Sequence, residues 1–174
     1  REHTLDWLLC NFDTKGENFI HRTDGHLSSF DKEASFSKLK DPEAAHMSTD
    51  YCPHANDTLY NVVFREYAQG TLTLDLSATL PQIQRMEAMD GNAYLALFGP
   101  MLDQKYGKPG PRNTARANAE AAILSRKNNL RAEYRRFFTE LVNKRRQALQ
   151  DQGQPDDCAN LLNQNGEFHF SDDP

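Results

Sequence analysis

The second half of the chain carries apolar residues at helical spacing. Leu59, Val63 and Tyr67 lie about one helical turn apart, and a longer apolar stripe runs among the arginines and lysines further along. The pattern predicts four helices: from a cap at Asn56 or Asp57 to a stop at Gly70, then over residues 79–89, 92–106 and 113–150. Residues 71–76 are expected to be extended, and the tail after Asp151 is expected to lack structure because it is acidic and rich in turn formers.

The first third of the chain has a different pattern. An apolar segment, Leu5–Leu9, predicts the end of a helix and runs directly into the polar stretch Asn11–Asn18. The dipeptide Asp24-Gly25 stands between apolar residues and predicts a tight turn, because glycine tolerates a positive φ. We therefore expect a β-hairpin over residues 19–30. Residues 33–54 contain two prolines and only short periodic pieces, which predicts a long loop with one helical turn.

Composition narrows the class of protein. Of the 174 residues 38% are hydrophobic, which suffices for one globular core, and no apolar run approaches the ~20 residues that a membrane span needs. The three cysteines, Cys10, Cys52 and Cys158, form no Cys-x-x-Cys pair, so we expect reduced thiols and a cytoplasmic location. The chain begins at Arg1 without a signal segment, and we expect it to be a fragment of a longer protein.

The net charge of -5 conceals an uneven distribution. Residues 112–150 carry 10 basic residues against 3 acidic ones, whereas residues 151–174 carry 6 acidic residues and no basic ones. A basic stretch can bind phosphates, but along a helix with apolar periodicity it is usually the solvated face. We therefore expect no nucleic-acid partner, and we expect the acidic tail to offset the basic helix.

One group of polar residues stands apart chemically. Asp13, Lys15 and Asn18 share the polar stretch, and Asp31 follows at the far end of the predicted hairpin, which would return it to the side of Asn18. Phosphoryl transfer needs a carboxylate that orients the attacking hydroxyl, a cation near the transferred phosphoryl group and oxygen ligands for Mg²⁺. These four residues supply all of those groups. The alternative is a surface loop in which Asp13 and Asn18 cap turns.

At these residues the sequence resembles the C-terminal lobe of the protein-kinase-like superfamily. Residues 13–18 resemble the catalytic loop, with the spacing Asp-x-Lys-x-x-Asn, and residues 24–31 resemble the hairpin that leads to the metal-binding aspartate. The wider string is more similar to the atypical branch, which includes phosphoinositide 3- and 4-kinases, actin-fragmin kinase and related bacterial enzymes. That string comprises Asp6, Leu9, Asn11, Asp13, Asn18-Phe19-Ile20, Leu27, Phe30-Asp31 and Phe36. The resemblance covers only about the first 36 residues.

The resemblance implies a function, a set of roles and a division of the chain. Asp13 would be the catalytic base or substrate-orienting carboxylate, Lys15 the contact to the phosphates of ATP, and Asn18 and Asp31 the ligands of Mg²⁺. The fold class is then α+β, mainly α: a kinase-like C-lobe (residues 1–150) and an acidic tail (151–174). Within that lobe, residues 1–36 would hold the catalytic and metal-binding loops, 37–55 the long loop and 56–150 a helical subdomain.

Departures from the family pattern define the alternatives. Phe12 stands where regulated protein kinases have arginine, and Lys32-Glu33 stand where Phe-Gly would follow the metal-binding aspartate, which favours an atypical kinase. Lys15 stands where the lipid-kinase branch usually has histidine, so a Ser/Thr protein substrate is preferred to a phosphoinositide. A non-catalytic pseudokinase that binds a partner is the third hypothesis.

The resemblance also sets expectations about what accompanies this chain. A kinase needs an amino-terminal lobe with a phosphate-covering loop, and residues 1–174 contain none, so we expect that lobe elsewhere in the same protein or on another chain. This half of a site would be inactive alone. A bacterial effector secreted into a host cytosol would have the same sequence features as a housekeeping kinase.

Overall fold

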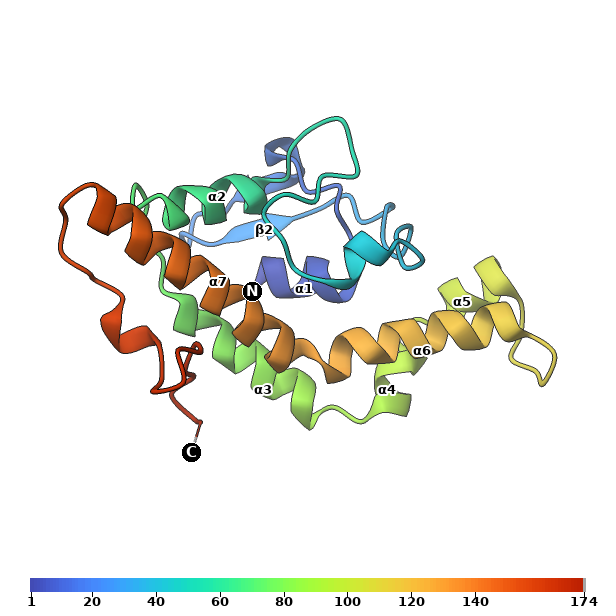
Figure 1. Cartoon of the computed structure of the whole chain (residues 1–174). Helices are drawn as coiled ribbons and strands as arrows, with labels where there is room; N and C mark the ends of the chain where they lie inside the picture. The colour runs from blue at the N-terminus through green and yellow to red at the C-terminus, as the bar shows by residue number, and fades with distance from the viewer. Residues whose placement is uncertain (174) are drawn as a thin grey trace.

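The computed structural model describes residues 1–173, which form a mainly helical fold with one two-stranded antiparallel sheet (Figure 1). The helices and strands are α1 (Glu2–Leu8), β1 (Phe19–His21), β2 (Leu27–Ser29), α2 (Leu59–Ala68), α3 (Leu80–Ala88), α4 (Gly91–Ala96), α5 (Gly99–Tyr106), α6 (Thr114–Asn128) and α7 (Leu130–Asp151). Short 3₁₀ helices lie at Gly16–Asn18, Pro42–Ala45, Leu76–Thr79 and Ala159–Leu161. The predicted class, α+β with mostly helix, is confirmed. In the described part of the chain, no helix combines the length and apolar character of a membrane span.

The N-terminal elements follow the prediction. The helix α1 ends one residue before Leu9, and the hairpin pairs Phe19 with Ser29 and His21 with Leu27. Gly25 adopts a φ of 82° in the turn, a conformation that favours glycine over any residue with a Cβ atom. The long loop contains its one helical turn at Pro42–Ala45.

The N-cap of α2 is Thr58, which is one residue after Asp57 and two after Asn56, the two predicted caps. Thr58 caps this helix by accepting a hydrogen bond from the backbone N–H of Asn61. Asp57 instead accepts hydrogen bonds from the Asn61 side chain and forms an ion pair with Arg65, so its carboxylate is engaged further along the helix. The end at Gly70 is as predicted, with a φ of 84°. Residues 71–76 pair in no strand: bends lie at residues 71–72, and a 3₁₀ helix begins at Leu76 after Asp75, whose backbone is extended.

Two of the predicted helices are divided in the structure. The helix over residues 79–89 forms as α3, with Pro81 in its first turn. The one over 92–106 is instead α4 and α5, because Pro100, in the first turn of α5, has no N–H to continue the hydrogen-bonding of α4. The one over 113–150 is capped by Asn113 as its start suggests, but it breaks at Asn129 into α6 and α7.

The hydrophobic core lies between α2 and α7, which pack against each other (Figure 1). Phe64 of α2 meets Phe137 of α7 edge to face, with ring centroids 5.1 Å apart, and Phe138 is fully buried. Trp7 and Leu8 of α1 are also buried in this core, and their packing fixes the position of α1 and of the loop that follows it.

The acidic tail is structured, contrary to the prediction. Cys158, Phe168 and Phe170 are buried, and the Phe168 ring packs against Phe138 with centroids 5.0 Å apart. Low overall hydropathy concealed these few aromatic anchors. The tail does offset the basic helix, but through direct ion pairs: Arg145 binds Asp157, Arg131 binds Asp172 and Arg135 binds Asp173. Pro174, the last residue of the predicted tail, lies outside the described residues.

Candidate functional site

The hairpin brings Asp31 to the end of the polar loop of residues 11–18, which we call the catalytic loop after the role predicted for it. The strand register places Ser29 opposite Phe19, and the backbone N–H of Phe30 donates a 2.9 Å hydrogen bond to the backbone carbonyl of Asn18. Asn18 and Asp31 therefore lie at the same end of the hairpin, although thirteen positions separate them in the sequence. The position of Asp31 follows from the tight turn at Gly25, as the sequence predicted.

Buried amides hold the catalytic loop in shape. The Asn18 side chain is only 4% exposed, and its Nδ2 donates a 2.8 Å hydrogen bond to the backbone carbonyl of Asp13. Asn11 is equally buried, and its Oδ1 accepts a hydrogen bond from the backbone N–H of Asp13. The carbonyl of Thr14 accepts a hydrogen bond from Leu59 at the start of α2, which fixes the middle of the loop. The fold thus brings Asp13 and Asn18 together.

The reactive atoms of the predicted site are left without protein partners. Within residues 1–173, the carboxylates of Asp13 and Asp31 accept no hydrogen bond and form no ion pair, and Lys15 pairs with no acidic side chain. The amide of Asn18 donates through Nδ2, so its Oδ1 is the atom left free to bind a ligand. Three oxygen-bearing side chains and one cation are therefore available to an external group.

Asp31 has an unusual backbone conformation. Its φ is 57°, in the left-handed region that most residues other than glycine seldom adopt, although aspartate enters it more readily than most. Cys10 and Phe36 share this conformation, and of the three only Asp31 is exposed. Such conformations cost free energy and are concentrated at functional sites, where the surrounding structure holds them. This strain is a feature that the sequence did not reveal.

The donor set suits a magnesium ion. Carboxylate and amide oxygens are hard ligands, and Mg²⁺ at phosphate-transfer sites is usually held by one or two protein groups together with phosphate oxygens and water. Asn18 and Asp31 would supply two such groups. Among residues 1–173 there is no group of three or more His, Cys, Asp or Glu side chains that could hold a metal, so a cage made only of such residues is not the arrangement here.

One face of the hairpin is apolar and exposed. Ile20 and Phe30 are 57% and 45% exposed, respectively. Ile20 pairs with Ser28, and Phe30 is two residues beyond Ser28, so both apolar side chains lie on the same face of the sheet. On the opposite face, Phe19 packs against the Tyr60 ring and Ser29 donates hydrogen bonds to Glu2. The hairpin is therefore covered on one side only.

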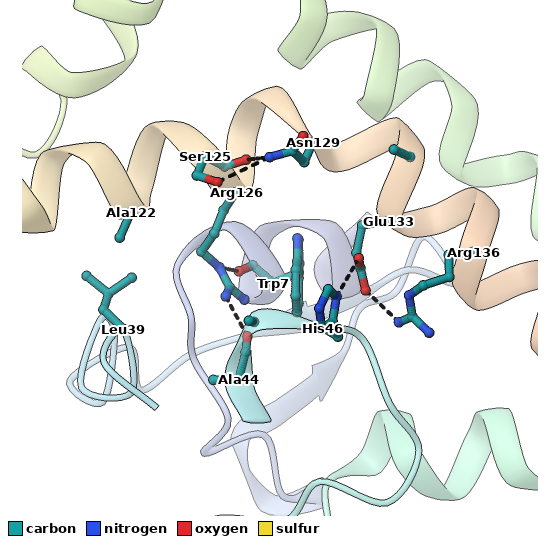
Figure 2. A pocket seen from close by; sticks show the side chains of 12 residues that line it. Trp7, Leu39, Ala44, His46, Ala122, Ser125, Arg126, Asn129, Glu133 and Arg136 are labelled. Carbon is teal, nitrogen blue, oxygen red and sulfur yellow. Dashed lines mark hydrogen bonds and ion pairs between the residues drawn. The ribbon is translucent and has the colours of Figure 1, made fainter. Parts of the chain in front are cut away.

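A separate cavity of about 490 Å³ lies between the long loop and the α6–α7 junction (Figure 2). The guanidinium of Arg126 stacks on the Trp7 ring, 3.6 Å from its centroid, and donates hydrogen bonds to the carbonyls of Trp7 and Ala44. Burial would raise the pKa of Glu133, but hydrogen bonds from Arg136, the Met47 N–H and His46 hold that pKa below its usual value.

The residues that line this cavity hold the long loop in place, and none of the predicted site residues is among them. Two N–H groups there, Trp7 Nε1 and Arg126 Nη2, have no acceptor among the described residues. Neither atom is reached by solvent, so neither can contact a ligand in the cavity as it stands. The charged side chains that line it serve the fold.

Comparison with known proteins identifies no relative. The chain matches no model of a protein family, no curated protein and no solved structure. Any function must therefore be inferred from the site itself.

Proposed function

We propose that this chain is the C-terminal catalytic lobe of an atypical kinase, which transfers the γ-phosphoryl group of ATP to a serine or threonine hydroxyl of a protein. The observation that carries the proposal is the set of oxygen atoms on Asp13, Asn18 and Asp31 that the fold brings to one end of a hairpin and leaves without protein partners. None of these oxygens is among the buried side-chain atoms that lack a partner in the described chain, so each is open to an external group. Carboxylate and amide oxygens left open in this way can bind a hard cation such as Mg²⁺.

Each side chain has a distinct task in this proposal. Asp13 orients the acceptor hydroxyl and takes its proton as the oxygen–phosphorus bond forms and ADP leaves. Lys15 donates to oxygens of the phosphate chain, and Asn18 and Asp31 hold Mg²⁺. The metal, when bound, neutralises charge on the phosphate oxygens.

The apolar face of the hairpin supports a nucleotide ligand. Ile20 and Phe30 lie on the exposed face. Ile20 is two residues after Asn18, and Phe30 directly precedes Asp31, the other residue that would hold Mg²⁺. A flat adenine base covering these side chains would place its phosphates toward Asn18 and Asp31. A hydrophobic platform beside oxygen ligands is an arrangement that suits ATP better than a free metal ion.

The test is phosphate transfer by the full-length protein that contains this chain. With labelled ATP and Mg²⁺, we expect Asp13→Asn and Asp31→Asn each to lower transfer to a mixture of protein substrates by about 10²–10⁴-fold. Glu17→Gln is the matched control, because Glu17 is an exposed carboxylate of the same loop with no task in the proposal.

Three results would overturn the proposal or part of it. Unchanged transfer by Asp13→Asn would remove that residue from catalysis. Label found only in phosphatidylinositol vesicles would replace the protein acceptor with a lipid. A wild-type protein that binds Mg²⁺-ATP without transferring phosphate to either acceptor would be a pseudokinase.

A further inference from the structure

The buried carboxylate of Asp6 is hydrogen-bonded to residues on both sides of the candidate site. Asp6 is on α1 and only 2% exposed, which is rare for a carboxylate unless it is well paired. One of its oxygens accepts hydrogen bonds from Asn11 Nδ2, at 2.8 Å, and from Lys32 Nζ. The other accepts a 2.8 Å hydrogen bond from the hydroxyl of Tyr60. Asp6 has no free oxygen with which to contact a substrate.

The first two donors belong to the two loops that carry the proposed chemistry. Asn11 opens the catalytic loop, and its Oδ1 accepts from the backbone N–H of Asp13. Lys32 is the residue directly after Asp31. A continuous path therefore runs from Lys32 through Asp6 and Asn11 to Asp13.

The third donor connects the same carboxylate to α2. Tyr60 is on the first turn of α2, and the neighbouring Leu59 N–H donates to the carbonyl of Thr14 in the catalytic loop. Burial and the nearby Asp6 carboxylate both raise the pKa of Tyr60, so its hydroxyl keeps the proton that it donates. Asp6 is thus the one side chain on this path that contacts α2, the catalytic loop and the segment after Asp31.

Only a side chain that accepts hydrogen bonds at both of its polar atoms can take the place of Asp6. Three donors converge on Asp6, and an amide in its place would direct an N–H₂ group at one of them. The same change would leave the Lys32 ammonium, whose side chain is 27% exposed, without its acidic partner. The strained backbone at Asp31 depends on its surroundings to persist, and Lys32 is the adjacent anchor.

We propose that Asp6 is a positioning residue that couples the catalytic loop to the metal-binding loop, so that Asp13 and Asp31 keep a fixed relation to each other. This inference rests on the proposed function, because it assigns Asp6 a task only if Asp13 and Asp31 act together. Asp6 itself touches neither the nucleotide nor the acceptor.

The decisive variant is Asp6→Asn in the full-length protein. We expect kcat to fall about 10–100-fold, the range typical when a group behind a metal ligand is lost. We also expect the Mg²⁺ concentration at half-maximal rate to rise while KM for the protein acceptor stays unchanged, which a mere loss of stability would not produce. Binding of Mn²⁺, followed by its paramagnetic resonance signal, should weaken in parallel.

Matched variants separate positioning from folding. Asp103→Asn is the control, because Asp103 is a partly buried carboxylate on α5 paired with Arg116 and Lys108, away from both loops. It should leave kcat and the Mg²⁺ dependence unchanged. Lys32→Met should reproduce the Asp6→Asn defect, and Lys32→Arg should restore most of the rate. The double variant Asp6→Asn/Lys32→Met should be no worse than the poorer single variant, since both break one link.

The outcomes distinguish this inference from the proposed function. If folded Asp6→Asn keeps the wild-type kcat and Mg²⁺ dependence, the coupling is wrong and the kinase stands. If the wild type binds Mn²⁺ but transfers no phosphate, the kinase is wrong and the coupling is judged by whether Asp6→Asn binds Mn²⁺ more weakly. If the wild type binds no Mn²⁺, both are wrong.

Discussion

The hairpin region and the helical core of this protein are built on opposite principles. Between α2 and α7, aromatic side chains such as Phe64 and Phe138 are buried against one another, and the charges nearby are paired. In the hairpin the strands have three residues each, Ile20 and Phe30 are exposed, and the carboxylates of Asp13 and Asp31 have no partner in the described chain. Stability therefore resides mainly in the helices, and the two carboxylates beside the hairpin are left unpaired within residues 1–173.

The same substitution in each region should give the largest contrast. Phe138→Ala would open a cavity in a site with no exposure and should lower the free energy of unfolding by about 3–5 kcal/mol. Phe30→Ala removes a side chain that is 45% exposed and should cost about 1 kcal/mol or less. Urea denaturation of the two variants measures the difference, and equal losses would contradict the division between a stabilising core and an open hairpin.

We expect acid to lower the stability of the protein by weakening the ion pairs between the tail and α7. Hydrogen bonds from Arg145 lower the pKa of Asp157 to about 2, and Arg131 likewise holds the pKa of Asp172 below its usual value. Because these folded-state values lie below the ordinary value of 3.8, both carboxylates stabilise the fold above about pH 4, and this contribution disappears as the pH falls toward 2.

The measurement for the tail is the melting temperature against pH. The wild type should lose stability between about pH 4 and 2, with a shallower acid limb in Asp157→Asn and a lower melting temperature at pH 7. Half of the Asp157 side chain is exposed, so solvent moderates the effect. A pH profile identical in wild type and variant would show that the tail is not held by this ion pair.

The smallest effect on stability is expected at the outer face of the hairpin. Ile20→Ser should change the free energy of unfolding by no more than about 0.5 kcal/mol, because the side chain is 57% exposed. On the proposed function it should nevertheless weaken ATP binding by the full-length protein about tenfold, since burial of an aliphatic side chain by a ligand is worth about 1.5 kcal/mol or more. Leu97→Ser is the calorimetric control, because Leu97 is 65% exposed at the C-cap of α4. Equal ATP affinity in the two variants would exclude the hairpin face as the adenine platform.

Local sequence signals accounted for much of the fold. The turn at Asp24-Gly25, the stop at Gly70 and the start at Asn113 were predicted because each depends on the conformational preference of one or two residues. The juxtaposition of Asn18 and Asp31 followed from the same turn. The roles assigned to those residues, and the kinase-like C-lobe itself, stay predictions, since they depend on a resemblance that no comparison tests.

The burial of Phe170 and the network around Asp6 could not be predicted, because both depend on segments far away in the sequence. The guanidinium of Arg131 lies over the Phe170 ring, and Tyr60 donates a hydrogen bond to Asp6. From its composition the tail was predicted to be acidic and unstructured. An average over residues cannot show that Phe168 and Phe170 are buried in the core, or that Asp172 and Asp173 form ion pairs with arginines of α7. The sequence alone predicted several turns and helix ends, such as those at Gly25 and Gly70, because each depends on the preference of one or two residues. The packed structure decided which polar groups have hydrogen-bond partners within the protein and which lack them, because such partners meet only after the chain has folded.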